Sequence, residues 1–351
     1  KAMELLPLGP VVFIDTPGLD DEGGLGGLRV QRSLDILNKT DVAILVTTAE
    51  NGIGPCETRL LERLREKKIP FVTVLNQIDR FPPSDETKAA VAAQSGVPVH
   101  AVSCVTREGI EPLKIALSKI VPDETGERHL IGDLLQPGDL VVLVTPIDAA
   151  APKGRLILPQ QQVLRDILDT GAAAVVTQVP QLEGVLKGLA APPRLVVTDS
   201  QAFGPVSAIV PETVPLTSFS ILFARYKGDL AALMAGAEAV ANLKDGDRIL
   251  IAEGCTHHRQ EDDIGTVKIP RMLTKKSGKQ LVFDHTSGIQ YARNLTDYAL
   301  IVHCGGCMLN RREMLWRIAQ ARDAGVPIVN YGVLIAALQG ILPRAADVVR
   351  N

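Results

Sequence analysis

Short apolar runs rich in Val, Ile and Leu recur along the whole chain, and each ends in polar or glycine residues. Runs of this length and composition predict buried β-strands, and the amphipathic stretches between them predict helices. One such stretch is RREMLWRIAQARDAG (311–325), which Gly325 closes as a C-cap. The alternation indicates βαβ units and parallel sheets. The predicted strands are 11–17, 42–48, 71–77, 97–103, 139–146, 172–179, 193–200, 247–255, 280–288, 298–307 and 326–332.

These strands form three consecutive series, separated by segments that interrupt the pattern. VPDETGE (121–127) follows the first series, and Pro211 and Pro215 in IVPETVPL mark a second candidate linker. We therefore predict an α/β protein of three consecutive α/β domains with mainly parallel sheets. The predicted domains are 1–122, 128–209 and 210–351.

Composition narrows the classes of function. The 351 residues are 46% hydrophobic and 22% charged, with a formal net charge of -3 and no block of Lys or Arg. This charge balance argues against a nucleic-acid partner, and no apolar stretch reaches the roughly 20 residues of a membrane span. Five unevenly spaced cysteines do not suggest a disulfide framework. We expect a cytoplasmic protein whose cysteines can bind metal.

The run VVFIDTPG ends in a polar sequence typical of phosphate-binding enzymes. In P-loop NTPases an aspartate at this place reaches the magnesium ion, and a glycine N–H faces the γ-phosphate. Asp15 and Gly18 fit these catalytic roles, and Thr16 and Pro17 complete the motif. The glycine-rich segment that follows, DDEGGLGGLR, is typical of one that orders when the γ-phosphate is present.

Two further strand ends predict guanine recognition. In FVTVLNQID, Asn76 and Asp79 match the motif Asn-Lys-x-Asp, with Gln77 in the lysine position. The Asp79 carboxylate would accept from guanine N1–H and the exocyclic amine, which adenine lacks. AVSCVTREGIEPL places Ser103 and Cys104 at the third loop around the base. The ordered motifs resemble the translation-factor-like GTPases related to Era and to the tRNA-modification GTPase, which implies bound GTP and Mg²⁺.

Two GTPase elements are missing from this sequence, the phosphate loop and the first switch with its threonine. No G-x-x-x-x-G-K-[ST] occurs anywhere in it, so the lysine and the amide cradle for the β- and γ-phosphates are absent. The sequence also begins at what would be the third strand of such a domain. We expect an upstream segment, and we expect the chain as written to be inactive as a GTPase.

Three cysteines lie at predicted strand ends in the last series. Cys255 ends DRILIAEGC, and Cys304 and Cys307 end YALIVHCGGC. Because the carboxyl ends of parallel strands share one edge, these thiols can converge although they are far apart in sequence. Three thiolates suit an iron–sulfur cluster whose fourth iron is held otherwise. The candidates for the fourth ligand are Asp262, His257, His258, Glu261 and His303.

Other interpretations of the cysteines remain open at this point. A lone C-x-x-C is also found in dithiol enzymes and zinc half-sites, and a Cys3His zinc site is the main competitor. A purely structural group of buried thiols is a further alternative. Cys56 is expected to be a surface or packing residue of the first domain.

The combined pattern of Cys255, His257, His303, Cys304 and Cys307 behind a GTPase-like domain resembles the FeFe-hydrogenase maturation GTPases of the HydF family. The resemblance implies a P-loop GTPase-like domain, a Rossmann-like dimerisation domain and a cluster-binding domain. It implies a 4Fe–4S cluster on the three cysteines, with Asp262 as the leading fourth ligand. It also implies a homodimer or higher oligomer that takes a diiron precursor from the radical-SAM maturases HydE and HydG and delivers it to apo FeFe-hydrogenase. GTP would act as a switch.

Two other classes of function compete with this interpretation. One is a GTPase of ribosome or tRNA maturation whose tail holds a structural Cys3His zinc site, which predicts a basic RNA-facing surface. The other is an interaction scaffold whose middle α/β unit pairs with its twin and whose motifs are remnants.

Overall fold

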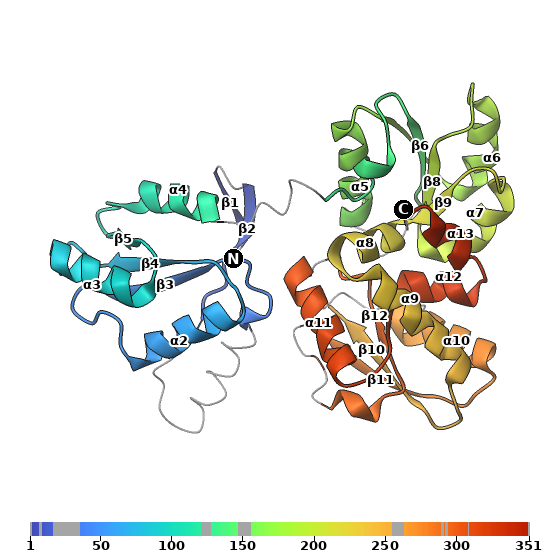
Figure 1. Ribbon diagram of the computed structural model, residues 1–351. Coiled ribbons are helices and arrows are strands. Elements are labelled where there is room, and N and C mark those ends of the chain that lie inside the picture. The colour runs from blue at the N-terminus through green and yellow to red at the C-terminus, as the bar shows by residue number, and fades with distance from the viewer. Residues whose placement is uncertain are drawn as a thin grey trace. The chain divides into compact units, whose positions relative to one another are not determined.

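The structure is a computed structural model that describes residues 2–6, 9–16, 36–120, 128–146, 156–254, 263–288, 291, 294–307 and 309–349. The chain divides into two compact units, residues 1–124 and 125–351, which are coloured from blue to red along the chain in Figure 1. Both units are built mainly from parallel sheets with helices on their faces, which confirms the predicted α/β class.

The first unit contains a three-stranded parallel sheet in the order β3-β4-β5. Its strands are β3 (Ala43–Thr48), β4 (Phe71–Asn76) and β5 (Val99–Ala101). Its helices are α2 (Pro55–Glu66), α3 (Asp85–Ser95) and α4 (Ile110–Ile120). The central strand β4 is buried on both faces up to Leu75, as its unbroken apolar sequence predicts. Its last residue, the half-buried Asn76, therefore lies directly at the boundary of the core.

The region of the first predicted strand differs from the expectation. β1 (Ala2–Leu5) and β2 (Gly9–Val12) form a separate antiparallel pair, in which Leu5 lies opposite Gly9. The strand ends at Val12 rather than at residue 17, and Phe13 to Thr16 have no regular secondary structure. Among the described residues, the β1–β2 ladder ends at Val12, four residues before the last described residue of the predicted strand.

The second unit contains two four-stranded parallel sheets with the same topology, β7-β6-β8-β9 and β11-β10-β12-β13. In each sheet the first strand in sequence pairs with the second and the third, and the fourth follows at the edge. The first sheet consists of β6 (Leu140–Val144), β7 (Ala173–Thr177), β8 (Leu195–Thr198) and β9 (Leu216–Ser218). The second consists of β10 (Arg248–Glu253), β11 (Val282–Ser287), β12 (Leu300–His303) and β13 (Ile328–Asn330).

Helices cover both sheets, and α8 and α12 lie between them (Figure 1). The helices beside the first sheet are η1 (Gly132–Leu134), α5 (Leu158–Asp169), α6 (Val179–Gly188), η2 (Ser200–Ala202), α7 (Phe203–Ile209) and α8 (Phe219–Lys227). Those beside the second are α9 (Leu230–Glu238), η3 (Ala239–Asn242), η4 (Ile264–Lys268), α10 (Ile269–Ser277), η5 (Leu295–Asp297), α11 (Arg311–Asp323), α12 (Tyr331–Leu338) and α13 (Leu342–Asp347).

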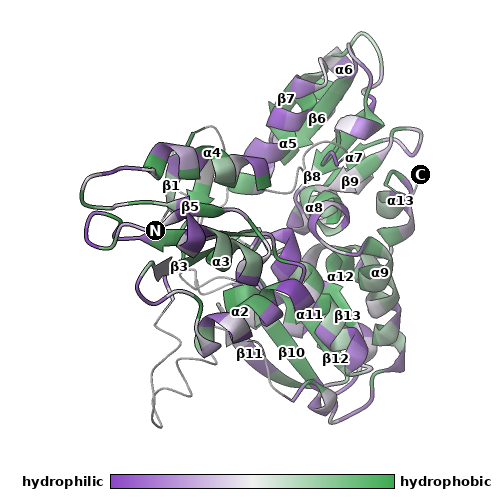
Figure 2. Ribbon diagram, turned by 60° about the vertical axis from the view of Figure 1, so that its left-hand side comes forward, coloured by the Kyte–Doolittle hydropathy of each residue, from purple (hydrophilic) through white to green (hydrophobic). Residues whose placement is uncertain are grey.

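One hydrophobic core joins the two sheets of the second unit. Buried residues such as Leu143 in β6, Phe219 in α8 and Ile249 in β10 belong to the same cluster. Figure 2 shows this as green strands in β6, β8, β10 and β12, while α11 carries purple residues on its outer surface. Burial of one shared apolar core makes the unit cohesive, because its two sheets cannot separate without exposing that surface.

The C-terminal helix α13 returns to the first of these sheets. The Arg344 guanidinium donates to the carbonyls of Val210, Pro211 and Val214, at 3.1, 2.6 and 3.1 Å. The buried Thr217 hydroxyl of β9 donates to the carbonyl of Ala345 at 2.8 Å. The predicted second linker is thus held by side-chain hydrogen bonds, and the β9 strand follows it. The division of the chain into domains 1–122, 128–209 and 210–351 stays a prediction.

Candidate functional site

The predicted guanine-reading residues meet at the carboxyl edge of β4 and β5. The Asp79 carboxylate accepts from the Ser103 hydroxyl at 2.5 Å, and the backbone N–H of Thr106 donates to that same hydroxyl at 3.1 Å. Asp79 is exposed and Ser103 is buried, so the pair links the surface of the edge to its interior. This arrangement fixes the direction of the Asp79 side chain before any ligand binds.

Asn76 and Gln77 have unusual features at this edge. Asn76 Oδ1 is buried without a hydrogen-bond partner among the residues that the structure describes. A buried amide oxygen normally has a donor, so this atom marks a place where a ligand or water would complete the bonding. Gln77 has a positive φ of 61°, which costs a non-glycine residue about 1–2 kcal/mol. Cys104 is exposed beside Ser103.

The phosphate-side residues are only partly described. Asp15 and Thr16 are exposed and follow β2, whereas Pro17 and Gly18 lie outside the described residues. The catalytic roles of Asp15 and Gly18 therefore stay predictions.

The cysteine loop begins where β12 ends. Because β10 and β12 are adjacent, with Ala252 opposite His303, their ends lie side by side. The Cys304 N–H donates to the carbonyl of Ala252 at 2.8 Å, and the Gly254 N–H donates to Cys304 Sγ at 3.1 Å. Gly254 is the residue directly before Cys255 in the chain. The two predicted cysteine-bearing strand ends thus touch through a backbone N–H to sulfur hydrogen bond.

The rest of the loop turns tightly towards α11. Gly306 has a positive φ of 64°, and a Cβ there would lie 3.3 Å from Met314 Sδ. The Leu309 N–H donates to the carbonyl of Gly306 at 3.0 Å, and Asn310 caps α11 by accepting from the Glu313 N–H at 3.0 Å. Cys304 and Cys307 are both half-buried.

Lys227, at the end of α8, reaches this loop from the neighbouring sheet. Its Nζ donates to the carbonyls of Cys307 and Leu309, both at 2.9 Å, and lies 5.2 Å from the centre of the Phe223 ring. Burial lowers the pKa of Lys227, and the nearby Cys307 partly offsets that effect. No local sequence pattern predicts this contact.

His303 is fully buried and is bonded on both sides. Its Nδ1 lies 2.7 Å from the carbonyl oxygen of Cys304, and its Nε2 lies 3.0 Å from an Arg317 Nη. Burial, helped by the adjacent Arg317, lowers the pKa of His303 to about 3. The ring is therefore neutral, donates from Nδ1 and accepts at Nε2. Both nitrogens are used within the protein in this arrangement, and neither is directed at a metal.

Arg317 is itself the centre of a buried network. Its side chain donates to the Glu313 carboxylate at 2.6 Å and to the carbonyl of Gly288 at 2.9 Å. Its guanidinium also lies 5.2 Å from the centre of the Tyr291 ring. Arg317 shares the buried face of α11 with Met314. That shared face was the available signal for a buried arginine, because charged residues on such a face are rarely solvated.

A second buried acidic group lies at the end of β10. The Tyr331 hydroxyl lies 3.3 Å from Glu253 Oε1, and both side chains are buried. Burial, then the charges of Glu253 and Cys304, raise the pKa of Tyr331. Asp263 Oδ1 accepts from the N–H groups of Gly265 and Thr266 at 3.0 and 2.8 Å. Sequence reasoning missed Glu253 and Tyr331, which surround the cysteine loop from β10 and α12.

The remaining predicted ligands lie outside the described residues. They are Cys255, His257, His258, Glu261 and Asp262. Among the residues that are described, no three His, Cys, Asp or Glu side chains converge as a metal site. The described members of the predicted donor set are His303 and the two half-buried thiols of Cys304 and Cys307, and the Gly254 N–H donates to Cys304 Sγ. Thiolate sulfur with a backbone N–H donor is the environment that iron–sulfur clusters use.

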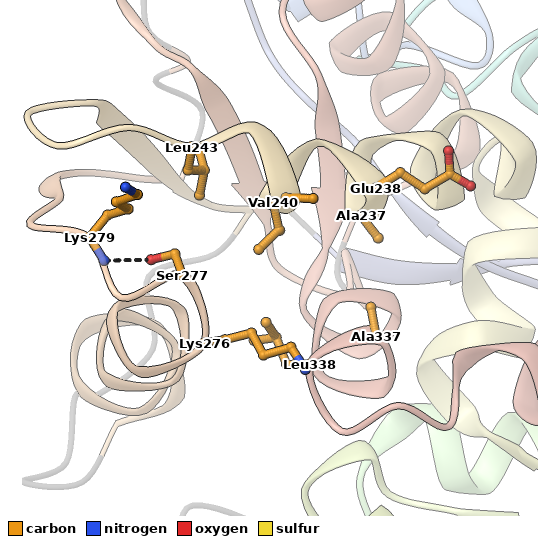
Figure 3. A pocket seen from close by; sticks show the side chains of 10 residues that line it. Ala237, Glu238, Val240, Leu243, Lys276, Ser277, Lys279, Ala337 and Leu338 are labelled. Carbon is orange, nitrogen blue, oxygen red and sulfur yellow. Dashed lines mark hydrogen bonds between the residues drawn. The ribbon is translucent and has the colours of Figure 1, made fainter.

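A separate hollow of about 380 Å³ lies away from the cysteines, between the ends of α9, α10 and α12 (Figure 3). Ala237, Val240, Leu243 and Leu338 give it an apolar wall, with Lys276 and Lys279 at its rim. It contains none of the predicted site residues. None of the described helices is long and apolar enough to cross a membrane.

Together these features define an α/β protein that joins a GTPase-type domain to two parallel-sheet domains, one of which carries a cysteine loop. Family models agree with this class. Residues 10–123 match the elongation factor Tu GTP binding domain, residues 130–228 the hydrogen maturase F dimerization domain, and residues 231–348 the hydrogen maturase F tetramerization domain. In this order they match the architecture of the HydF hydrogenase maturase GTPases, and we place the chain in that family.

Curated relatives resemble about a third of the chain or less. GTPase Era of Carboxydothermus hydrogenoformans is 30% identical over 119 residues, which are 33% of this chain and 40% of that protein. GTPase Era of Rippkaea orientalis is 27% identical over 142 residues, 36% of this chain and 45% of that protein. GTPase Era of Clostridium botulinum is 35% identical over 80 residues, 22% of this chain and 27% of that protein. The chain thus spans less than half the length of these relatives.

Proposed function

We propose that this protein is a GTP-dependent carrier in the maturation of FeFe-hydrogenase. It would hold a 4Fe–4S cluster, accept a diiron precursor from the radical-SAM maturases HydE and HydG, and deliver it to apo-hydrogenase. The observation that carries the proposal is the hydrogen bond from Gly254 N–H to Cys304 Sγ, because it joins the two strand ends that bear the cysteines. The family architecture supports the biological context.

Cys255, Cys304 and Cys307 would hold the cluster as thiolates. When bound, such a cluster supplies an iron with an exchangeable position, to which another molecule can attach. Gly305 and Gly306 allow the loop to turn close to it, and the Gly254 N–H stabilises negative charge on Cys304 Sγ.

The fourth ligand is proposed from the acidic and histidine residues after Cys255. Asp262 stays the leading candidate, followed by His257 and Glu261. His303 is less suited, because its two ring nitrogens are bonded to the carbonyl of Cys304 and to Arg317. Its neutral ring instead holds the loop carbonyl in place.

In a complete protein that includes a phosphate loop, the first domain would bind GTP with Mg²⁺ and hydrolyse it, whereas the chain as written lacks that loop and is expected to be inactive. Asn76, Gln77, Asp79, Ser103 and Cys104 would surround the base, and the preset Asp79 carboxylate supports guanine as its partner. Asp15 would reach the metal, with Thr16, Pro17 and Gly18 near the γ-phosphate. The nucleotide would act as a switch for partner binding. Equal rates of cluster transfer with GTP, GDP and no nucleotide would contradict that role.

The second unit would form the homo-oligomer. The two matched domain models describe dimerization and tetramerization, which supports a homodimer or a higher assembly.

The test of the cluster site is anaerobic reconstitution with iron and sulfide, followed by iron analysis and electron paramagnetic resonance. We expect the wild-type chain to bind about four irons and Cys304→Ala to lose the signal. Cys104→Ala is the matched control, because Cys104 is exposed and belongs to the first unit. An unchanged cluster in Cys304→Ala, or protein that retains zinc and takes up no iron, would refute the proposal in favour of a structural zinc site.

A further inference from the structure

The end of helix α8 and the cysteine loop are joined by two reciprocal contacts. Lys227 Nζ donates to the carbonyls of Cys307 and Leu309 at 2.9 Å each. In the opposite direction, an Nη of Arg311, the first residue of α11, donates to the carbonyls of Tyr226 and Gly228, at 3.4 and 3.1 Å. The loop between Cys304 and α11 is therefore attached to α8 on both sides of Leu309.

A lysine in the last turn of a helix normally extends into water or interacts with the carbonyls of its own helix. Lys227 does neither in this structure, since its half-buried Nζ bonds to two carbonyls of a loop 80 residues further along the chain. Two hydrogen bonds from one flexible side chain restrict it strongly, because both carbonyls must be reached by the same rotamer.

The anchor at the end of α8 is rigid. Gly228 is buried, and a Cβ there would lie 2.8 Å from the carbonyl oxygen of Ala224 and 3.5 Å from Ile318 Cδ1. Close packing of this kind permits little movement of the backbone. Lys227 thus connects a fixed point on the dimerization-type domain, residues 130–228, to the turn that bears Cys307.

We propose that Lys227 is a positioning residue for Cys307, which holds the cysteine turn in the shape that places both thiols at one site and supplies a positive charge beside it. The inference rests on the proposed function as far as the cluster is concerned, but the positioning of the loop can be tested without one. It makes the cluster site dependent on a side chain of the neighbouring sheet, which the matched tetramerization domain alone does not contain.

The first measurement uses the full chain without iron. Hydrogen exchange followed by mass spectrometry should show at least fivefold faster exchange of peptides covering 304–310 in Lys227→Met than in the wild type. Lys187→Met is the matched control, since Lys187 on α6 is exposed and, within the part of the chain that the structure describes, bonds to Glu183 in the same helix. It should leave the exchange of the loop unchanged. Unchanged exchange in Lys227→Met overturns the inference.

The second measurement distinguishes the effect of the Lys227 positive charge from the effect of its hydrogen bonds to the loop. In reconstituted protein, Lys227→Met should lose iron to a chelator several-fold faster. It should also lower the ratio of reduced to oxidised cluster at a fixed potential about tenfold, which is 59 mV for a one-electron couple. Lys227→Arg keeps the charge and the hydrogen-bond donors, so it should restore both iron retention and the reduction potential. Lys227→Gln keeps donors but not the charge, so it should restore iron retention more than the reduction potential. An identical potential and chelation rate in Lys227→Met refutes the effect on the cluster.

The two experiments distinguish a failure of the proposed carrier function from a failure of the positioning role of Lys227. If the wild type takes up no cluster, the proposed carrier function fails, while faster exchange in Lys227→Met still supports the positioning role. If the wild type holds a cluster and the exchange is unchanged, the carrier function stands and Lys227 is a surface lysine.

Discussion

The two four-stranded sheets of the second unit have the same strand order and differ in what their strand ends carry. The register aligns Val144, Thr198 and Ser218 in the first sheet, and Ala252, His303 and Asn330 in the second. In the first sheet, Thr198 and Ser218 carry hydroxyl groups, and Ser218 caps α8. In the second, Asn330 likewise caps α12, but the middle position is the buried His303, which leads into the cysteine loop. The fold alone therefore does not determine the site.

Buried charge makes the difference sharper. Among the described residues, the buried acidic, basic and histidine side chains are Glu253, Asp263, His303, Glu313 and Arg317. All five surround the second sheet, whereas the buried polar residues of the first sheet are neutral. Burying charge is costly unless it is paired and hydrogen-bonded. His303, Glu313 and Arg317 meet this condition through their hydrogen bonds to one another, and a parallel sheet of the same topology folds without such a buried network.

The largest effect is expected from Arg317→Met. The substitution leaves the buried Glu313 carboxylate without its partner at 2.6 Å and removes the donor to His303 Nε2. Loss of one member of a buried ion pair costs about 3–5 kcal/mol, measured as the free energy of unfolding in urea. Arg165→Met, in the exposed Arg165–Asp169 pair of α5 with the same i,i+4 spacing, is the matched control and should cause no measurable loss. Equal losses in the two variants would contradict the contrast.

Alanine substitutions at two glycines compare how closely a helix packs against each of the two sheets. A Cβ at Gly236 in α9 would overlap the carbonyl of Ile328 in β13, so Gly236→Ala should cost about 1–3 kcal/mol through overpacking. A Cβ at Gly184 in α6 would meet nothing within 4 Å, so Gly184→Ala should raise stability by about 0.5–1 kcal/mol through helix propensity. Thermal unfolding of both variants checks the opposite signs. If both substitutions stabilise, α9 is not packed as tightly as described.

The sequence predicts most strands of the two sheets, but it predicts few of the side-chain contacts that distinguish them. The strands 139–146, 172–179, 193–200, 247–255, 280–288, 298–307 and 326–332 each contain an observed strand, because local apolar patterning is enough to define them. β9 was missed because it has only three residues, Leu216–Ser218, and follows Pro215. Such a short strand is defined by its pairing with β8 rather than by its own sequence.

The site shows the same limit. The meeting of Cys304 with the end of β10 follows from parallel topology, so the sequence could predict it. The contact of Lys227 joins residues 80 and 82 positions apart, and no local pattern encodes it. Arg317 lies between the predicted ligand His303 and the Glu313 carboxylate. Its position on the same helix face as Met314 could indicate its burial, but the partners that it bonds to are determined by the three-dimensional packing.

Alkaline pH should affect the second sheet through Tyr291. Burial raises its pKa above the usual value, partly opposed by Arg317. A raised pKa means that the neutral form is favoured in the folded state, so this contribution to stability is complete below pH 10 and is lost as pH rises. The loss should be about 1.4 kcal/mol at pH 11 relative to Tyr291→Phe, from urea unfolding at pH 8 and 11. Tyr226→Phe on α8 controls for the removal of one tyrosine. Identical pH dependence of Tyr291→Phe and wild type would exclude this contribution.

The smallest effect is expected from Ser200→Ala, at the hydroxyl edge of the first sheet. The Ser200 hydroxyl donates to Ser218 Oγ at 3.3 Å, and Ser218 also accepts from the Ile221 N–H at 3.2 Å as the cap of α8. The cap survives the substitution, so only one neutral hydrogen bond is lost, at a cost of about 0.5–1.5 kcal/mol in urea unfolding. Ser207→Ala, which removes a hydroxyl bonded within α7, is the control. A loss as large as that of Arg317→Met would mean that the neutral hydrogen bonds at the end of the first sheet stabilise the protein as much as the buried charges beside the second sheet. The buried ions of the second sheet would then need no functional explanation, because any polar group at such a strand end would be equally costly to remove.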